Sequence, residues 1–403
     1  MSSNGKEKVV LAFSGGLDTS YCVKYLIHEK GLEIYSILVN TGGFSAEELE
    51  EIEKRAYSLG VKEHRNVDVQ QKFYEDAIRF MVFGNILKNH SYPLSVSAER
   101  TIQAETVAEY VKEKGADYVA HGSTGAGNDQ VRFDFIFEVL IPDVKILTPI
   151  RDLKLSRQEE IDYLKSHGVE SSWEKSRYSI NQGLWGTSVG GVETLTSNTD
   201  LPESAYPTQL TETEISTLKI SFKKGEVCGV NDRKMDPVSA IKEISRIAGP
   251  YAIGRDIHVG DTIIGIKGRV GFEAAAPLLI IKGHHALEKH TLTKWQLYWK
   301  EQLANWYGMM LHEAQYLDPV MRNIEAFLTD SQQTVTGDVF IELRPYHFHV
   351  KGIESPHDLM TSSFGAYGEM NKLWSGEDVR GFTRILANTS KIFHTVNKDV
   401  SND

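Results

Sequence analysis

Residues 9–20 decide the fold, with VVLAF followed directly by SGGLDTS. The first five residues are a short apolar run, as expected for a strand buried on both faces of a parallel sheet. The next seven form a glycine loop, and a helix with an inner stripe of Cys22, Tyr25 and Leu26 follows and ends near Gly31. Glycines at such a turn let the backbone approach a polyphosphate, and the helix N-terminus favours an anion. The segment therefore predicts a strand–loop–helix unit that binds phosphate.

The loop does not end in the Gly-Lys-Ser/Thr of a Walker sequence, which disfavours a kinase or GTPase of the usual kind. The alternative without function is a tight strand-to-helix turn that binds nothing. The polar residues around the glycine pair argue against that alternative.

Apolar strand runs and amphipathic helices alternate up to about residue 150. Further strands are expected at 34–39, 67–69, 118–121 and 145–148. Ser45 and Glu48 form a capping box that starts one helix, and Gly115 closes another that begins near Arg100. This alternation predicts an α/β fold with a doubly wound parallel sheet, whose ligands bind at the carboxyl ends of its strands. The glycine loop at 14–20 and a second one at 122–128 should therefore converge.

The pattern changes to a mixed α+β arrangement after about residue 170. Asp236 and Pro237 start a helix that runs to about Ala248, and residues 263–266 are expected to form a strand. One long helix is expected at 286–306 and another at 376–396. The expected domains are 1–170, 171–374 and a helical tail at 375–403. The tail helix carries enough apolar surface to dock on a neighbouring subunit.

Composition restricts the class of protein. The chain of 403 residues is 41% apolar and 25% charged, as in ordinary soluble proteins. Its apolar runs are too short for a membrane span, and its N-terminus shows no signal peptide. Two cysteines exclude a disulfide framework and favour a reducing cytoplasm. The net charge of −11 disfavours a nucleic-acid partner.

Several motifs carry a family resemblance. Residues 14–20 look like the signature of the ATP pyrophosphatases, and residues 121–133, HGSTGAGNDQVRF, are highly specific. The other matching segments are Tyr92-Pro93-Leu94 with Ser97 and Arg100, Tyr178-Ser179, Gly254-Arg255-Asp256, residues 265–269, Val335-Thr336-Gly337 and residues 378–382. Nearly end to end, the chain resembles the argininosuccinate synthase family.

The resemblance implies a homotetrameric ligase that uses Mg²⁺ and cleaves ATP to AMP and pyrophosphate while joining citrulline to aspartate. Its implied ATP-binding residues are Ala12, Phe13, Ser14, Gly15, Gly16, Leu17, Asp18, Thr19, Ser20 and Gly122. Its implied aspartate-binding residues are Thr124, Asn128 and Asp129. Its implied citrulline-binding positions are Tyr92, Ser97, Asn128, Arg132, Ser179, Ser188, Gly260 and Phe272. Asp18 and Asp129 are the implied catalytic residues, and the metal's ligands are left open.

Two of these roles make sense from side-chain chemistry alone. Arg132 offers a planar fork for a carboxylate, and Asp129 accepts hydrogen bonds from an ammonium. Without the family resemblance, this stretch would read as an ordinary polar loop. A metal site at His347 and His349 is disfavoured, because no third ligand is evident. His284, His285 and His290 are expected at a solvated helix entrance.

The chain departs from the family's pattern at a few positions. Asn181-Gln182-Gly183 replaces Asp-Glu-Asn, and glycine replaces glutamate at Gly190 and Gly260. The other departures are Phe272 for tyrosine, Ala126 for lysine and Arg177 for a proline or aromatic residue. Several of these positions belong to the end of the pocket that holds the amino-acid head of citrulline.

Loss of two glutamates there would leave a desolvated α-ammonium poorly matched, and glycines open space. One hypothesis is therefore that the substrate is Nα-acylated, for example N-succinylcitrulline. The other hypothesis is that different residues contact the ammonium of plain citrulline. Two further classes also remain open, namely another ATP pyrophosphatase such as a tRNA thiolase, and a degenerate homologue that senses a nucleotide or amino acid.

Overall fold

The structure is a computed structural model that describes residues 6–170, 177–364, 367–368 and 373–398. The chain forms two compact units, residues 1–356 and 357–403. The expected domain boundary between residues 170 and 171 borders a stretch that lies outside the described residues.

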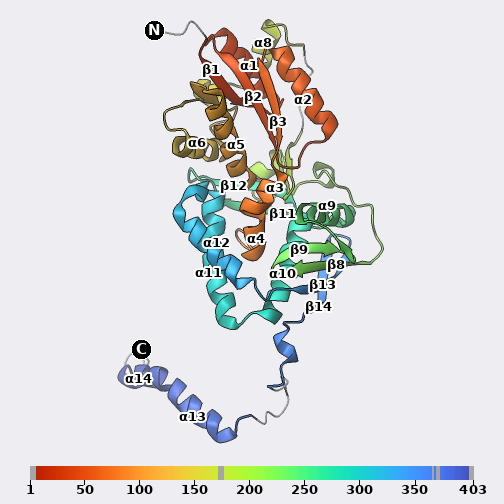
Figure 1. The fold of residues 1–403 in the computed structure, drawn as a ribbon, viewed down its shortest axis with the longest axis vertical. Coiled ribbons are helices and arrows are strands. Elements are labelled where there is room, and N and C mark those ends of the chain that lie inside the picture. Colours follow the sequence, from red (N-terminus) through yellow and green to blue (C-terminus); the bar gives the residue numbers. More distant parts are fainter. Residues whose placement is uncertain (1–5, 171–176, 365–366, 369–372, 399–403) are drawn as a thin grey trace. The chain divides into compact units, whose positions relative to one another are not determined.

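A parallel sheet of five strands forms the N-terminal part of the first unit (Figure 1). Its order is β3-β2-β1-β4-β5, and every pairing within it is parallel. The strands are β1 (Lys8–Ala12), β2 (Glu33–Asn40), β3 (Glu63–Asp68), β4 (Tyr118–Ala120) and β5 (Lys145–Leu147). The predicted doubly wound α/β sheet is confirmed.

Helices cover both faces of this sheet. One face packs, in a hydrophobic core cluster, against α1 (Leu17–His28), α2 (Ala46–Leu59), α7 (Pro149–Leu153) and α8 (Arg157–Ser166). The opposite face packs against α5 (Glu99–Lys114) and α6 (Asp129–Leu140). Val9 and Leu11 belong to one cluster and Val10 to the other, because successive side chains of a strand point to opposite faces. This explains the continuous apolar run in β1.

The strand order reverses at β1, which lies between β2 and β4. The connections after β1 and β4 therefore leave in opposite directions, and a crevice opens at the carboxyl ends of these two strands. The two glycine loops follow exactly these strands in the sequence, so the topology brings them to one place.

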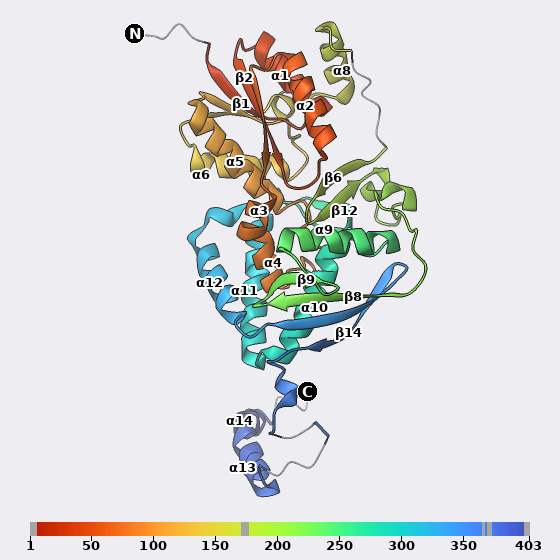
Figure 2. The same ribbon diagram turned by 45° about the vertical axis from the view of Figure 1, so that its right-hand side comes forward.

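Two antiparallel sheets form the rest of the first unit (Figure 2). A four-stranded sheet has the order β11-β12-β7-β6 and a five-stranded sheet the order β10-β9-β8-β13-β14. Their strands are β6 (Ser179–Gly183), β7 (Gly186–Gly190), β8 (Ser216–Lys223), β9 (Glu226–Val230), β10 (Arg233–Lys234), β11 (Arg255–Asp261), β12 (Lys267–Glu273), β13 (Gly337–Arg344) and β14 (His347–Glu354). The helices of this part are α9 (Pro237–Ala248), α10 (Ala275–Thr291), α11 (Lys294–His312) and α12 (Pro319–Ser331).

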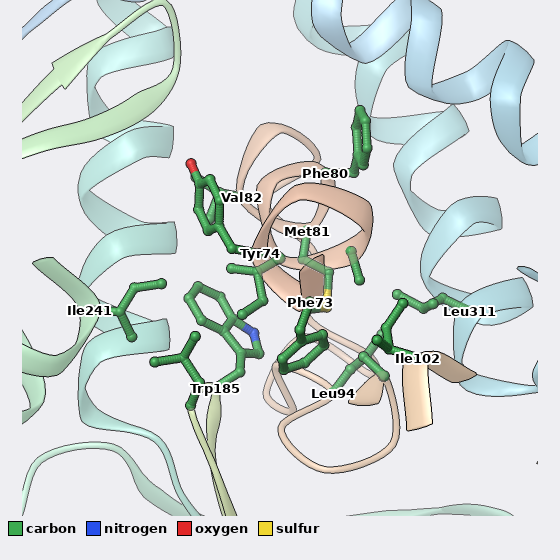
Figure 3. Close-up of a cluster of buried hydrophobic side chains, with 14 of the residues drawn as sticks. Phe73, Tyr74, Phe80, Met81, Val82, Leu94, Ile102, Trp185, Ile241 and Leu311 are labelled. Atoms are coloured by element: carbon green, nitrogen blue, oxygen red, sulfur yellow. The ribbon is translucent and has the colours of Figure 1, made fainter. Parts of the chain in front are cut away.

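A short helical segment links the parallel sheet to this second part. It consists of α3 (Gln70–Phe73), a π-helical turn (Tyr74–Ile78) and α4 (Arg79–Phe83). Its apolar side chains pack around Trp185 from the turn between β6 and β7 and Ile241 from α9 (Figure 3). The Trp185 Nε1 donates to the Pro93 carbonyl at 2.9 Å. This bond fixes the β6–β7 hairpin against the segment that carries Tyr92 and Ser97.

Three predicted element boundaries need correction. Residues 263–266 form the turn between β11 and β12, with Gly265 at φ +84°, and so no strand lies there. The helix expected at 286–306 is split between α10 and α11, because Thr293 caps α11 through the N–H of Gln296. Strand β3 begins at Glu63, before the expected residue 67, because an edge strand with one exposed face tolerates polar residues.

His284 was expected near solvent, and this prediction is wrong. The residue is fully buried in α10, where its ring nitrogens lie 2.7 Å from Asn85 Oδ1 and 2.8 Å from Gln332 Oε1. Burial lowers the pKa of His284 to about 4. Its role is therefore to hold the helices together as a neutral hydrogen-bonding group.

The second unit contains α13 (Gly376–Leu386) and α14 (Asn388–Val396), where one helix was expected. Neither helix buries a residue, although Phe382, Ile385, Ile392 and Phe393 are all apolar. The expected apolar face is thus present and exposed in the single chain.

Candidate functional site

The loop between β1 and α1 presents the N-terminus of a helix. Gly15 has φ +75°, and a Cβ there would lie 2.9 Å from Ile52 Cγ1. Gly16 is the N-cap, so no side chain of that residue occupies the free N–H groups of the first turn. Ser20 Oγ donates to the Gly16 carbonyl at 2.7 Å and holds the turn from beneath. The loop therefore offers free backbone donors to a phosphate group.

The second glycine loop packs directly on the first. A Cβ at Gly122 would lie 3.3 Å from Asp18 Cβ and 3.2 Å from Thr19 Cγ2. Only a glycine lets the two backbones approach this closely without a shift. The predicted convergence of the loops is confirmed.

A hydrogen-bonded chain orients the start of the second loop. His121 is buried, and its Nε2 lies 2.8 Å from Asp134 Oδ1. Its Nδ1 accepts from the Ser123 N–H at 3.2 Å. Arg151 Nη1 donates to Asp134 Oδ2 at 2.6 Å and completes this hydrogen-bonded chain. No sequence pattern predicted this hydrogen-bonded chain, although His121 directly follows β4, at the edge of the sheet where ligands bind.

A cavity of about 800 Å³ lies against the first loop. Its lining includes most of the predicted ATP-binding residues, namely Ala12, Phe13, Ser14, Gly16, Leu17, Asp18, Thr19 and Gly122. Gly15 and Ser20 do not line it, because Gly15 faces Ile52 and Ser20 is fully buried. The structure adds cationic and apolar lining residues that the sequence analysis did not name: Arg55, Arg157, Ile37, Val39 and Phe44. The cavity can thus hold both an anion and an apolar ring.

A second cavity of about 490 Å³ adjoins the first. The two share the lining residues Asp18, Arg100, Gly122, Ser123, Asp129 and Asn181. The second also collects predicted substrate residues from distant segments: Tyr92, Ser97, Thr124, Asn128, Arg132, Ser179, Ser188 and Gly260. Phe272 does not line it, because this residue is fully buried with its ring 5.3 Å from that of Tyr92.

Asp129 lies between two arginines at the junction of the cavities. Its Oδ2 is 3.0 Å from Arg100 Nε, and its Oδ1 is 2.7 Å from Arg132 Nη1. Burial alone would raise the pKa of Asp129, but the two guanidinium groups outweigh it and lower the pKa to about 2. Asp129 is therefore a fixed negative charge, suited to an ammonium or amine ligand.

Arg132 has fewer free hydrogen-bond donors for a substrate carboxylate than the sequence suggested. It is buried, and its Nε donates to the His312 carbonyl at 3.0 Å while Nη1 faces Asp129. Arg177 lines neither cavity, since its exposed guanidinium pairs with Glu193 at 3.1 Å. Ala126 is exposed and likewise outside both linings.

One face of the four-stranded sheet forms a wall of the second cavity. The pairings Ser179↔Gly190, Gly260↔Gly268 and His258↔Val270 place these residues on the same face. A Cβ at Gly190 would meet nothing closer than Ser179, at 3.9 Å, whereas one at Gly260 would lie 2.8 Å from His258 Nε2. The glycines at 190, 260 and 268 thus add no side chains to this face, and the imidazole of His258 lies beside Gly260.

Among the described residues, no group of three or more His, Cys, Asp or Glu side chains could hold a metal ion. The same part of the chain contains no helix long and apolar enough to cross a membrane. His347 and His349 lie on β14, outside the linings of both cavities.

The parallel sheet with its glycine loop and adjoining substrate cavity defines a nucleotide-using enzyme of the α/β class. Residues 8–170 match the family model of the arginosuccinate synthase N-terminal HUP domain, and residues 178–393 match that of the arginosuccinate synthase C-terminal domain. The chain belongs to the argininosuccinate synthase family and is an ATP-dependent ligase that forms AMP and pyrophosphate.

Curated relatives agree with this assignment over most of the chain. Argininosuccinate synthase of Methanocaldococcus jannaschii is 38% identical over 365 residues, covering 89% of this chain and 91% of that protein. The enzyme of Dictyoglomus turgidum is 37% identical over 383 residues, covering 94% of this chain and 96% of that protein. That of Xanthomonas axonopodis pv. citri is 34% identical over 410 residues, covering 99% and 97%. These matches favour the synthase over a tRNA thiolase.

Proposed function

We propose that the protein joins aspartate to the ureido carbon of a citrulline-type substrate at the expense of ATP, in arginine biosynthesis. The observation that carries this proposal is the junction of the two cavities. A nucleotide beside the first glycine loop and a ureido compound in the second cavity would meet at Asp18, Gly122 and Asp129, which line both.

The reaction has two steps. The ureido oxygen attacks the α-phosphorus of ATP and displaces pyrophosphate. The aspartate amine then attacks the ureido carbon, loses a proton and expels AMP. The free N–H groups at the start of α1 bind phosphate oxygens, while Thr124, Asn128 and Asp129 hold aspartate. Catalysis rests on positioning and fixed charges, and it uses no protein nucleophile.

Mg²⁺ fits this site as an ion carried mainly by the nucleotide. Asp18 is the carboxylate at the start of α1 that lines both cavities, and Mg²⁺ typically takes one or two carboxylates beside phosphates and water. Asp18 would hold the ion, which neutralises negative charge on pyrophosphate when bound.

For the substrate itself, we propose an Nα-acylated citrulline such as N-succinylcitrulline. Gly190 and Gly260 stand where the family's pattern has glutamates, and Gly190 leaves open space beside Ser179, a lining residue of the second cavity. The carboxylates in the second lining are Asp18, Asp129 and Asp261. In this proposal Asp129 already binds the aspartate substrate, and Asp261 pairs with Lys267 at 2.7 Å. A free α-ammonium would find few acceptors there, whereas an amide carries no charge to compensate.

Turnover decides between the substrates. Pyrophosphate release with ATP and aspartate should show a higher kcat/KM for N-succinylcitrulline than for citrulline. A higher kcat/KM for free citrulline would overturn the acyl proposal. Absence of ATP-dependent turnover with either would instead favour a sensor that only binds its ligands.

We also propose a cytoplasmic homotetramer. The apolar faces of α13 and α14 are exposed, and α11 exposes Trp295, Trp299 and Trp306. Such surface is usually covered in an assembly. Light scattering at several concentrations should give four times the mass of the chain, and a monomer at all of them would contradict this.

A further inference from the structure

Arg100 lies in the first turn of α5 and lines both cavities. Its Nε donates to Asp129 Oδ2 at 3.0 Å, and its Nη2 donates to Asn181 Oδ1 at 3.3 Å. Its Nη1 donates to Glu99 Oε1 at 2.8 Å and to Gln103 Oε1 at 2.9 Å. A guanidinium presents its N–H donors in one rigid plane, so partners on every nitrogen hold the group in a single position and orientation.

Glu99 anchors this guanidinium on the nucleotide side of the junction. The Glu99 side chain is only 2% exposed, and its Oε2 accepts from the Thr41 hydroxyl at 2.7 Å. Thr41 directly follows β2, at the carboxyl edge of the parallel sheet. Glu99, Gln103 and Thr41 line the first cavity and not the second. Arg100 therefore extends from a fixed base beside the parallel sheet to the second cavity.

Arg100 and Arg132 together orient the Asp129 carboxylate. Arg132 Nη1 lies 2.7 Å from Asp129 Oδ1, while Arg100 contacts Oδ2. Arg132 is itself held by the His312 carbonyl, which accepts from its Nε at 3.0 Å. The terminal torsion of an aspartate side chain is soft, so a fixed partner on each oxygen is needed to hold the plane of the carboxylate. The Asp129 side chain is still 39% exposed and lines both cavities, so its remaining lone pairs are accessible at their junction.

The two steps of the proposed reaction differ in their need for Asp129. The first step joins the ureido oxygen to the α-phosphorus of ATP and involves no amine. The second step needs the aspartate amine within reach of the ureido carbon, and a small misplacement of a bound reactant lowers the rate strongly. A loss of orientation at Asp129 should therefore impair the use of aspartate and spare the release of pyrophosphate.

We propose that Arg100 is a positioning residue for the second step, which holds the Asp129 carboxylate in the orientation that binds the aspartate amine. The inference rests on the proposed function, in which Asp129 binds aspartate, and it adds a residue that acts through Asp129. Lysine would replace Arg100 only in part, because an ammonium is a point charge and lacks the planar fork that joins Glu99 to Asp129.

Steady-state kinetics of Arg100→Gln test this role, with the faster of citrulline and N-succinylcitrulline as the ureido substrate. The value of kcat/KM for aspartate should fall about tenfold or more, as expected for loss of a charge-assisted hydrogen bond. The value of kcat/KM for ATP reports on the steps up to pyrophosphate release, and at saturating aspartate it should change by less than about twofold. Arg100→Lys should recover part of the loss for aspartate.

Arg65→Gln is the matched control. Arg65 lies on β3, outside both cavities, and its guanidinium pairs with Glu113 at 2.6 and 2.7 Å. This variant should leave both values of kcat/KM unchanged.

Equal losses for ATP and aspartate in Arg100→Gln would show a general structural role and overturn the inference, as would an unchanged kcat/KM for aspartate. If Arg100→Gln does not fold, the same comparison of ATP with aspartate in Arg100→Lys decides. Absence of aspartate-dependent turnover by the wild type would overturn the proposed function, and the inference with it.

Discussion

Replacement of Gly190 by glutamate should shift the enzyme toward free citrulline. Gly190 pairs with Ser179 and shares the cavity face with Ser188. A Cβ at this position would lie 3.9 Å from Ser179, which is ordinary van der Waals contact. Gly190 is not itself in the lining of the second cavity, but it lies on the same sheet face as the lining residues Ser179 and Ser188. The substitution therefore adds a carboxylate to that face with no steric cost at the backbone.

The magnitude follows from the new contact. A hydrogen bond between an ammonium and a carboxylate contributes about 1.5–3 kcal/mol, and ordering the glutamate side chain costs about 1 kcal/mol. The net gain of about 0.5–2 kcal/mol corresponds to a rise of roughly two- to thirtyfold in kcat/KM for citrulline. Turnover of N-succinylcitrulline should fall, because the new side chain fills the space proposed for the acyl group.

The assay is pyrophosphate release at saturating ATP and aspartate, with each ureido substrate in turn. Gly190→Gln is the matched control, since it has nearly the same shape and no charge. Equal effects of glutamate and glutamine would show that only volume matters. An unchanged preference in Gly190→Glu would refute the idea that this position faces the amino-acid head of the substrate.

Three other perturbations test the fold. Gly15→Ala should destabilise the protein by about 1–3 kcal/mol and raise the KM for ATP, because of its φ of +75° and the clash beneath it. Gly168→Ala, with φ +73° and no neighbour within 4 Å, should show only the backbone cost in urea unfolding and leave that KM unchanged. Lys300→Met should lower the free energy of unfolding by about 3–5 kcal/mol. The reason is that the buried Glu288 carboxylate loses the ammonium that lies 2.8 Å from it. A loss below about 1 kcal/mol would contradict this. Burial raises the pKa of Glu99 from 4.5 to about 7. The folded state therefore favours the protonated carboxyl, and this contribution to the free energy of unfolding is complete below pH 4.5 and is lost as pH rises through 7. Glu99→Gln should therefore flatten the unfolding free energy between these pH values, by up to about 3 kcal/mol, and an unchanged pH profile would contradict the shift.

Local signals in the sequence predicted the helix starts well. Ser45 with Glu48 forms the expected capping box, and Asp236 accepts from the Ser239 N–H at the start of α9. The break at Thr293 carried the same kind of signal, since Gln296 completes a capping box there. It was missed because the apolar pattern continues across the break. The turn at 262–266 was taken for a strand because Ile263, Ile264 and Ile266 have high strand propensity, although Ile264 and Ile266 are exposed.

The sequence by itself determined the parallel sheet, the glycine loop and the family. Each depends on residues close together in the chain, where strand burial, helix capping and backbone freedom act locally. Only the tertiary structure decided which residues share the substrate cavity. The contacts of Tyr92 with His258 and of Asn89 with Val259 join segments about 170 residues apart in the chain, which no local pattern records. Packing also decided that Arg132 turns to Asp129 and that Gly190 leaves open space on the cavity wall.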